Sequence, residues 1–359
     1  MQTISVPLQK KSYPIWIKNS LINNIHELLD SLNQGQRWVV FSQKVIFDLY
    51  GIELVNNLSS HKFKVDSIIL NGNEDAKSID EVRKIYSQLI SFGCDRNTTF
   101  IALGGGVVGD VTGFIAATYM RGVDYIQIPT SLLAMVDSSI GGKTGVNLKE
   151  GKNLVGSIWQ PKAVIIDPKL LKTLSTREIA SAFGEIIKYG AIFDRVFLDL
   201  INHNIEDLIN LNNDDLLEQI IGRCVKLKAD IIARDEFELG QRKILNFGHT
   251  IGHALEIYFG FENLRHGEAI SYGMLAAGKL SVKYSRLDNE KYHLLHNVIK
   301  KLPLPKLSNF KSDEILKIMQ RDKKVKLDKF NFVLLKDIGD PVIYNNISNN
   351  SILNILETL

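Results

Sequence analysis

Three histidines and one glutamate in this chain have the residue types and the spacing of a metal site. His249 and His253 are four residues apart, so on a helix they would share one face. His266 follows after a loop-like segment, and Glu185 lies upstream in an apolar run. Three imidazoles, or two with a carboxylate, are typical ligands of zinc. The sequence therefore predicts a metalloenzyme. Spacing alone leaves open whether both His249 and His253 bind the ion or one of them faces the substrate.

Charged and amide side chains accompany these histidines. Glu185 and Lys188 are three apart in a helical pattern that is apolar nearly all round, which favours a function for both. Lys228 falls on a later predicted helix, and Arg242 and Asn246 are four apart just before the histidines. Such groups gathered on buried faces are more typical of an active site than of a core. The paired histidines occur as HTIGH, which lacks the glutamate base of H-E-x-x-H metalloproteases, so peptide hydrolysis is not expected.

A glycine-rich turn indicates a dinucleotide. Gly104, Gly106 and Gly109 follow the strand-like TTFIAL and satisfy G-x-G-x-x-G at the start of a helical pattern. Glycine permits close approach of the backbone to a pyrophosphate, and the helix N-terminus adds partial positive charge. The next predicted strand, DYIQIP, ends at Pro129 rather than at an acidic residue that could hold a ribose. The pattern therefore favours a variant of the usual dinucleotide-binding arrangement.

A second glycine-rich stretch, residues 128–153, suits an anionic ligand. Asp137, Lys143, Lys152 and Asn153 lie there among small residues, and lysines beside flexible backbone can bind phosphate or carboxylate. The letters GGKT resemble the end of a P-loop. The first glycine of that motif would fall on Asp137, so a Walker motif is excluded.

The order of predicted elements places these motifs in two domains. The first half alternates strand-like runs with helical patterns, which predicts an α/β domain with a Rossmann-like parallel sheet over residues 1–170. Residues 171–359 read mostly as helices, including 176–192 and 246–260, with a late strand at 331–339. This second part is expected to be an α-helical domain that binds the metal and the substrate.

Composition narrows the class of protein. The chain has 359 residues, of which 45% are hydrophobic, and a net charge of +3, so neither a nucleic-acid nor a membrane partner is expected. Its two cysteines cannot form a disulfide framework. The N-terminus lacks a signal-peptide pattern, and no apolar run approaches the ~20 residues of a membrane span. A cytoplasmic location is the expectation.

Taken together, these motifs resemble those of the 3-dehydroquinate synthases. The matching segments run in order along the chain as GGGVVGDVTGFIAATYMRG, IPTSLLAMVDSSIGGKTGVN, GKNLVGSIWQP, GEIIKYG and RKILNFGHTIGHALE with LRHGE. The resemblance implies conversion of 3-deoxy-D-arabino-heptulosonate 7-phosphate to 3-dehydroquinate and phosphate in the shikimate pathway. Transient oxidation by NAD, phosphate elimination, reduction and aldol cyclisation make up that reaction. It also implies a divalent metal, usually Zn²⁺ with Co²⁺ as an alternative, and a homodimer.

The resemblance also implies a role for each matching residue. The metal would be held by Glu185, His249 and His266, with His253 facing the substrate. The residues implied at NAD are Glu74, Lys77, Gly104, Gly105, Gly106, Val107, Gly109, Asp110, Thr130, Ser131, Lys143, Lys152, Thr173, Leu174 and Glu178. Those implied at the substrate are Lys228, Arg242 and Asn246 for the carboxylate, Lys143, Asn153 and His253 for the phosphate, Asp137 and Lys188 for ring hydroxyls, and Lys152 and Arg121, the last reaching a neighbouring subunit.

Three positions depart from the family pattern. Relatives usually have glycine before the region of the metal-binding glutamate, where this chain has Ala182. Relatives often have aspartate at the end of the first nucleotide strand, where this chain has Ser42. A basic residue commonly precedes the late strand, where this chain has Asn331, with Lys329 and Lys336 nearby. One ribose contact and one phosphate contact of the family therefore have no direct counterpart.

Three other functions are weighed against this one. A cyclase that makes an inosose or a valiolone acts on a substrate without a carboxylate, which Lys228, Arg242 and Asn246 disfavour. A metal- and NAD-dependent polyol dehydrogenase would accumulate NADH. A non-catalytic binding protein with the same fold would not need buried charges.

Overall fold

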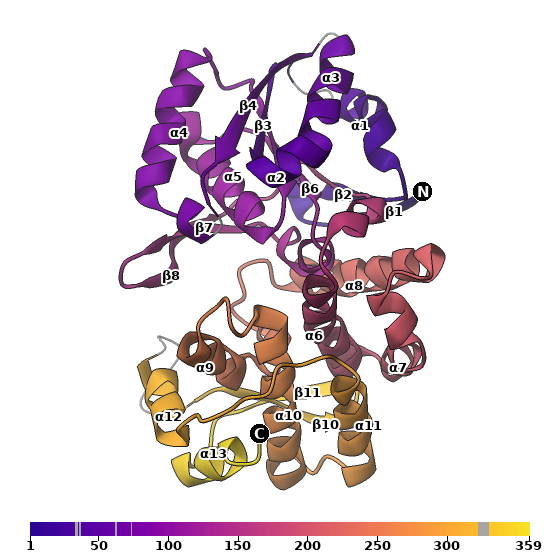
Figure 1. Ribbon diagram of the computed structural model, residues 1–359, viewed down its shortest axis with the longest axis vertical. Helices are drawn as coiled ribbons and strands as arrows, with labels where there is room; N and C mark the ends of the chain where they lie inside the picture. The colour runs from indigo at the N-terminus through magenta and orange to yellow at the C-terminus, as the bar shows by residue number, and fades with distance from the viewer. Residues whose placement is uncertain (33–34, 36, 62, 73, 322–329) are drawn as a thin grey trace. The chain divides into compact units, whose positions relative to one another are not determined.

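The computed structural model describes residues 1–359 except 33–34, 36, 62, 73 and 322–329 (Figure 1). The chain folds into two compact units. The first comprises Met1–Leu174 and Asp214–Phe237, and the second comprises Ser175–Asn213 and Glu238–Leu359.

The first unit contains a seven-stranded sheet with helices. The sheet strands are β1 (Gln2–Val6), β2 (Tyr13–Ile17), β3 (Arg37–Gln43), β4 (Lys64–Leu70), β5 (Thr99–Gly104), β6 (Tyr125–Pro129) and β9 (Ala163–Ile166). Its α-helices are α1 (Ile25–Ser31), α2 (Lys44–Ile46), α3 (Ile52–Ser60), α4 (Ile79–Ser91), α5 (Gly106–Thr118) and α8 (Asp214–Arg234). A separate hairpin consists of β7 (Lys143–Leu148) and β8 (Gly151–Ile158).

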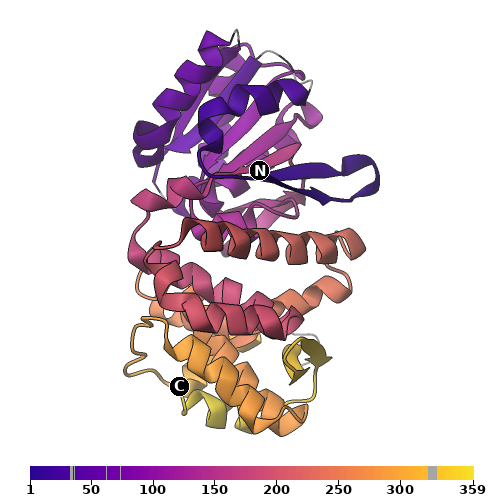
Figure 2. The same ribbon diagram turned by 90° about the vertical axis from the view of Figure 1, so that its right-hand side faces the viewer.

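The order of the strands identifies where a ligand is expected. The sheet runs β1-β2-β9-β6-β5-β3-β4, and every neighbouring pair is parallel except β1 with β2, which form the indigo hairpin of Figure 2. From β3 the chain adds β4 on one side and β5 on the other. The strand order therefore reverses between β3 and β5, and ligands of such sheets bind outside the carboxyl ends of the strands at this point. Those ends are Gln43 and Gly104.

Alternating side chains explain how helices cover the sheet. Val39 and Phe41 of β3 share one apolar cluster with Phe100 and Ala102 of β5 and with residues of α4 and α5. Residues of opposite parity, such as the buried Trp38, point to the other face. Strands that are apolar on both faces are typical of a parallel sheet covered on each side.

Helix α8 shows how the two units interleave along the chain. The sequence-based division at residue 170 places it in the second domain, whereas in the structure it belongs to the first unit and packs against β1. Its apolar face holds Leu217, Ile221 and Val225, all buried. A helical period shows that such a face is buried but does not show against which element.

The second unit is mostly helical. Its α-helices are α6 (Thr176–Phe193), α7 (Arg195–Ile209), α9 (His249–Phe259), α10 (His266–Tyr284), α11 (Asn289–Lys300), α12 (Ser312–Arg321) and α13 (Asn349–Leu356), and its strands β10 (Phe332–Asp337) and β11 (Asp340–Tyr344) pair antiparallel. The predicted fold class, a Rossmann-like α/β part and a helical part, is confirmed. Among the helices that the structure describes, none combines the length and hydropathy needed to cross a lipid bilayer.

The helix predicted over 246–260 is wrong at its start. Residues Gln241–Asn246 form a short 3₁₀ helix, η8, and α9 begins only at His249. Gly248 separates them with φ +78°, a conformation that glycine adopts without strain. Arg242 and Asn246 therefore do not continue the helical ridge of His249 and His253.

Candidate active site

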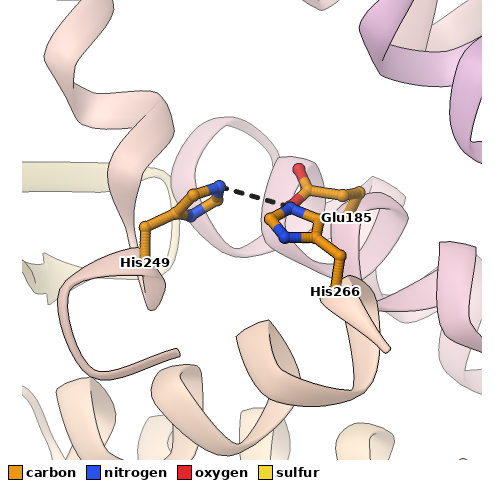
Figure 3. A group of neighbouring side chains, drawn as sticks. All are labelled: Glu185, His249 and His266. Carbon is orange, nitrogen blue, oxygen red and sulfur yellow. Dashed lines mark ion pairs between the residues drawn. The ribbon is translucent and has the colours of Figure 1, made fainter. Parts of the chain in front are cut away.

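Three helices of the second unit bring one carboxylate and two imidazoles together. Glu185 comes from the middle of α6, His249 is the first residue of α9, and His266 is the first residue of α10 (Figure 3). The Nε2 atoms of His249 and His266 each lie 3.5 Å from the same Oε1 of Glu185. The ligand atoms of the three residues lie within 4.8 Å of one another. This geometry makes the group a candidate metal site.

The hydrogen bonds of the two imidazoles fit a metal ion. The Nδ1 of His249 lies 3.1 Å from the carbonyl oxygen of Phe247, which can only accept, so Nδ1 carries the proton. The Nδ1 of His266 lies 3.2 Å from Oε2 of Glu256, which fixes the same tautomer. Both Nε2 atoms face Glu185 and are therefore the atoms that would bind an ion. Bonds of 2.0–2.2 Å at tetrahedral angles separate two ligand atoms by about 3.4 Å, close to the separations observed.

The surroundings shift the pKa values of the two imidazoles in opposite directions. Burial lowers the pKa of His249 well below its usual value, and the ammonium of Lys188 acts in the same direction, so this ring is neutral. Burial also acts to lower the pKa of His266, but hydrogen bonds to Glu185 and Glu256 outweigh it and raise the pKa to about 10. A metal ion that binds His266 must therefore displace a proton.

Glycines next to the three ligands let the helices approach closely. A Cβ on Gly267 would lie 1.7 Å from the carbonyl oxygen of Ser181, and one on Gly184 would lie 2.2 Å from that of Gly267. A Cβ on Gly273 would lie 1.9 Å from the carbonyl oxygen of Gly248. Backbone therefore touches backbone between α6 and α10 and between α10 and the start of α9. Sequence reasoning missed these contacts, because a single glycine does not name its neighbour.

The loop before His266 is fixed by Glu268. Its carboxylate accepts from the backbone N of Arg265 at 2.9 Å and from Nε and Nη2 of Arg177 at 2.7 and 2.9 Å. Arg177 also donates to the carbonyl oxygen of Asn263 at 2.7 Å. Two charged hydrogen bonds on a buried carboxylate hold the first turn of α10, and with it His266, in place. The sequence contained one signal for Glu268, its position in the first turn of a predicted helix.

Lys188 and Arg242 are buried as the sequence predicted for functional residues. Lys188 is 2% exposed, and its ammonium contacts Oε2 of Glu185. It also lies 5.2 Å from the centre of the Tyr189 ring. Arg242, also 2% exposed, lies in η8. A guanidinium and an ammonium kept in a protein interior need anionic partners or a function there.

Asn246 and His253 have different surroundings. The amide of Asn246 donates to Oε1 of Glu238 at 2.9 Å, a partner that sequence reasoning missed. Glu238 has φ +58°, which few non-glycine residues adopt. The ring of His253 lies 5.1 Å from that of His249 and 5.8 Å from that of His266. His253 is therefore a neighbour of the Glu185 group and not one of its three members.

In the first unit, the glycine turn lies where the strand order reverses. Strand β5 ends at Gly104, Gly105 caps α5, and α5 begins at Gly106. A Cβ on Gly104 would lie 2.4 Å from Val108, so packing requires that glycine. On Gly105 or Gly106 it would meet only the side chains of Ser131 and Ser138, whose hydroxyl oxygens would be nearest, at 3.3 and 3.1 Å. Packing within the protein therefore does not require glycine at 105 and 106 as strictly as at 104. Glycine at these two positions is consistent with close approach of the backbone to a pyrophosphate.

Around this turn, the structure places the neighbouring predicted residues. Ser42 is buried and donates to the carbonyl oxygen of Leu103 at 2.8 Å, so it links β3 and β5 at the reversal point. The backbone N of Thr130 donates to the carbonyl oxygen of Gly104 at 3.0 Å. The Oγ of Ser131 accepts a hydrogen bond from the backbone N of Ala134 at 3.4 Å. Val107 and Gly109 lie in α5, the latter facing Gln127.

Lys77 connects several residues predicted at the cofactor. It is 4% exposed, and its ammonium donates to Oδ2 of Asp110 and to Oδ1 of Asn153, both at 2.6 Å. Burial raises the pKa of Asp110, although Lys77 acts to lower it. Lys152 lies 3.4 Å from Oε1 of Glu74. The structure therefore gathers residues from three segments that are far apart in the sequence.

The second glycine-rich stretch is more ordered than a loop. Residues Ala134–Ser138 form a π-helical turn, η6, and residues 143–158 form the β7–β8 hairpin that sequence reasoning missed. Lys228 of α8 donates to Oδ1 and to the backbone oxygen of Asp137, both at 2.7 Å. Lys143 is exposed at the start of β7.

Four further predicted residues lie in different parts of the chain. Thr173 lies in the first unit, where its hydroxyl is 2.6 Å from that of Tyr50, and Leu174 ends that segment. Glu178 belongs to the second unit and pairs with Arg265 at 2.9 Å. Arg121 is exposed, with φ +67°.

Near the late strand β10, the structure places two of the three residues considered for the missing basic contact. The carbonyl oxygen of Asn331 accepts from Thr250 at 3.3 Å, and Lys336 is exposed in β10. Lys329 lies outside the described residues.

Comparisons with known proteins agree along the whole chain. Two family profiles match: "3-dehydroquinate synthase N-terminal" over residues 67–181 and "3-dehydroquinate synthase C-terminal" over residues 182–325. The 3-dehydroquinate synthase of Crocosphaera subtropica is 44% identical over 99% of this chain and 98% of its own.

Solved structures with the same fold include two cyclases. One is 2-deoxy-scyllo-inosose synthase complexed with carbaglucose-6-phosphate, NAD⁺ and Co²⁺ (TM-score 0.90, 24% identity, 99% and 100% of the two chains). The other is ValA, a 2-epi-5-epi-valiolone synthase from Streptomyces hygroscopicus subsp. jinggangensis with NAD⁺ and Zn²⁺ bound (TM-score 0.88, 27% identity, 98% of each chain).

Proposed function

The chain belongs to the 3-dehydroquinate synthase family, and we propose that it converts 3-deoxy-D-arabino-heptulosonate 7-phosphate into 3-dehydroquinate and inorganic phosphate. This is a carbon–oxygen lyase reaction of the shikimate pathway. The observation that carries the proposal is the convergence of Glu185, His249 and His266 on one point, with a buried cation beside them. We further propose a cytoplasmic homodimer.

The proposal includes two cofactors. A divalent ion such as Zn²⁺ or Co²⁺, held by Glu185, His249 and His266, would acidify a hydroxyl group that it coordinates. NAD, held at the β3–β5 reversal by Gly104, Gly105 and their neighbours, would accept a hydride and return it, so no net oxidation occurs. The NAD⁺ and metal ions of the two similar cyclase structures support both assignments.

The other residues would bind and orient the substrate. A heptulosonate phosphate carries a carboxylate and a phosphate, and the buried guanidinium of Arg242 can donate two parallel hydrogen bonds to a carboxylate. Asn246 and Lys228 are proposed to assist at the same group. Lys188, already in contact with the metal-binding carboxylate, would orient a hydroxyl close to the ion. Fixed orientation matters because one site serves oxidation, elimination, reduction and cyclisation.

The remaining assignments follow the family. We propose that Lys143, Lys152, Asn153 and His253 bind the phosphate end and that Asp137 orients a ring hydroxyl. Arg121 is proposed to reach into the second copy of the chain. Its backbone supports a constrained role, since Met120, Arg121 and Gly122 all have positive φ.

One assay tests the proposed function. The purified protein, supplied with the heptulosonate phosphate, catalytic NAD and Zn²⁺, should release inorganic phosphate with no net NADH. Glucose 6-phosphate and sedoheptulose 7-phosphate, which lack the carboxylate, serve as alternative substrates. Phosphate release from one of these at a higher kcat/KM would contradict the proposal and favour an inosose or valiolone synthase. NADH accumulation with glycerol would favour a dehydrogenase.

Replacing Arg242 with lysine tests the carboxylate role. The lysine keeps the charge but loses the bidentate geometry, so kcat/KM should fall by roughly 5- to 150-fold, equivalent to about 1–3 kcal/mol. The measurement is steady-state phosphate release. Lys243→Arg, an exposed change in the same short helix, is the control and should leave kcat/KM unchanged. Near-normal kinetics in Arg242→Lys would remove Arg242 from this role.

A further inference from the structure

We propose that Glu256 is a positioning residue that holds the imidazole of His266 in the orientation needed for metal binding. This inference rests on the proposed function, because it assumes that Glu185, His249 and His266 hold an ion. Glu256 has no part in that set, and the resemblance of its segment, RKILNFGHTIGHALE, implied no role for it.

The contacts of His266 occur at opposite sides of its ring. Its Nδ1 lies 3.2 Å from Oε2 of Glu256, and its Nε2 lies 3.5 Å from Oε1 of Glu185. A carboxylate that accepts from Nδ1 keeps a proton there, so the proton that a metal ion displaces is the one on Nε2, which faces Glu185. It also makes Nε2 a stronger donor to a cation. The hydrogen bond therefore determines both the tautomer and the direction of the ring.

Burial explains why His266 needs such a partner. The side chain of Glu185 is 1% exposed and that of His249 is 13% exposed, whereas that of His266 is 30% exposed. Packing therefore restricts the His266 ring least. The Glu256 side chain is only 13% exposed, and it comes from α9, two turns beyond His249.

The two histidines are held by different acceptors. The Nδ1 of His249 faces the backbone carbonyl oxygen of Phe247, two residues away in the chain. His266 instead depends on a side chain from another helix. Substitution of Glu256 can therefore release one ligand ring while leaving the backbone and the other two ligands unchanged.

An alternative interpretation is that Glu256 itself binds a metal ion. His253, Glu256 and His266 also offer ligand atoms within 4.8 Å of one another. This second group shares His266 with the first. On our proposal the carboxylate of Glu256 accepts the hydrogen bond from Nδ1 of His266 and is not a metal ligand. The chain therefore binds one ion, held by Glu185, His249 and His266. Binding of a second ion that depends on Glu256 would contradict the proposal.

The experiment measures metal affinity apart from catalysis. The metal-free full-length protein is titrated with Zn²⁺ against a chromophoric chelator and with Co²⁺ by visible absorption. We expect Glu256→Gln and Glu256→Ala to bind one ion with a Kd raised about 10- to 100-fold, the usual range for such supporting residues, and more in Ala than in Gln. Glu262→Gln removes the same charge from the exposed loop nearby and should leave the Kd unchanged.

Two further outcomes separate this inference from the proposed function. A structural role alone would lower the unfolding temperature of the metal-free protein, so that temperature should stay within a few degrees of the wild-type value in Glu256→Gln. If the wild-type chain binds Zn²⁺ and both Glu256 variants bind it equally well, only the positioning role fails. If the wild-type chain binds no ion, the proposed metal site fails first.

Discussion

Replacement of Glu185 by glutamine is expected to remove both metal binding and turnover. Glutamine keeps the shape of the side chain but loses the charge that faces both Nε2 atoms. Zn²⁺ binds a four-ligand structural site with a free energy of about 10–16 kcal/mol. Divided equally, this gives roughly 3 kcal/mol for one ligand, so its loss should raise the Kd at least about 100-fold. Metal content by mass spectrometry and phosphate release are the measurements. The wild-type protein stripped with a chelator should behave in the same way and recover with Zn²⁺ or Co²⁺.

The buried ammonium of Lys188 makes the Glu185→Gln substitution affect stability as well as metal binding. Replacing Lys188 as well provides the control. Lys188 contacts Glu185 and is 2% exposed, so Glu185→Gln leaves an ammonium without a compensating charge in the interior. Such a loss typically costs about 3–5 kcal/mol of stability. The double variant Glu185→Gln/Lys188→Met should therefore regain stability in urea without regaining the metal. A full complement of Zn²⁺ in the double variant would refute the assignment of Glu185 as a ligand.

The patterns that sequence reasoning found are local ones. The four-residue spacing of His249 and His253 and the apolar surroundings of Glu185 are visible because a helix repeats every 3.6 residues. The strand–turn–helix around Gly104 is equally local. Each of these features is contained in a short window, so the chemistry of the site could be predicted before its geometry.

The features that were missed depend on contacts between distant segments. The β7–β8 hairpin needs glycine at 145 and 156, because a Cβ on Gly156 would lie 2.3 Å from the carbonyl oxygen of Thr144 across the pair. In the sequence these residues read only as a flexible loop. In the sequence, nothing local shows which side chains Glu256 and Glu268 contact. Their partners, His266 and Arg177, become visible only when α9, α10 and α6 are packed.

The same reasoning explains why the start of α9 was misplaced. The helical period continues through Asn246 and His249, and nothing in the period marks a break. Gly248 has φ +78° where α10 passes directly beside it, and a Cβ there would lie 2.7 Å from Cγ of Met274 and 2.9 Å from the carbonyl oxygen of Ile270. The break lets His249 start a new helix with its ring toward Glu185. Tertiary packing therefore overrides local helical preference at a residue that the site needs.

The tightest of these backbone contacts gives the second large expected effect, for Gly267→Ala. The added Cβ would lie 1.7 Å from the carbonyl oxygen of Ser181 and 2.6 Å from its carbon, and no side-chain rotation can relieve a clash with backbone. Helices α6 and α10 would have to separate, at a cost of about 3 kcal/mol or more of unfolding free energy, the upper end for overpacking. Urea denaturation of the metal-free protein measures this cost.

The separation of the helices should also move one metal ligand away from another. Gly267 follows His266 and faces α6, which carries Glu185, so zinc affinity should fall together with stability. Gly278→Ala is the matched control on the same helix, because its Cβ would meet only side-chain atoms, the nearest being those of Tyr292 at 2.9 Å, and these can shift. It should lose less stability and keep its zinc affinity. Equal stability and equal zinc affinity of Gly267→Ala and the wild-type chain would show that α6 and α10 are not in backbone contact, and the convergence of Glu185 and His266 would then lack its structural basis.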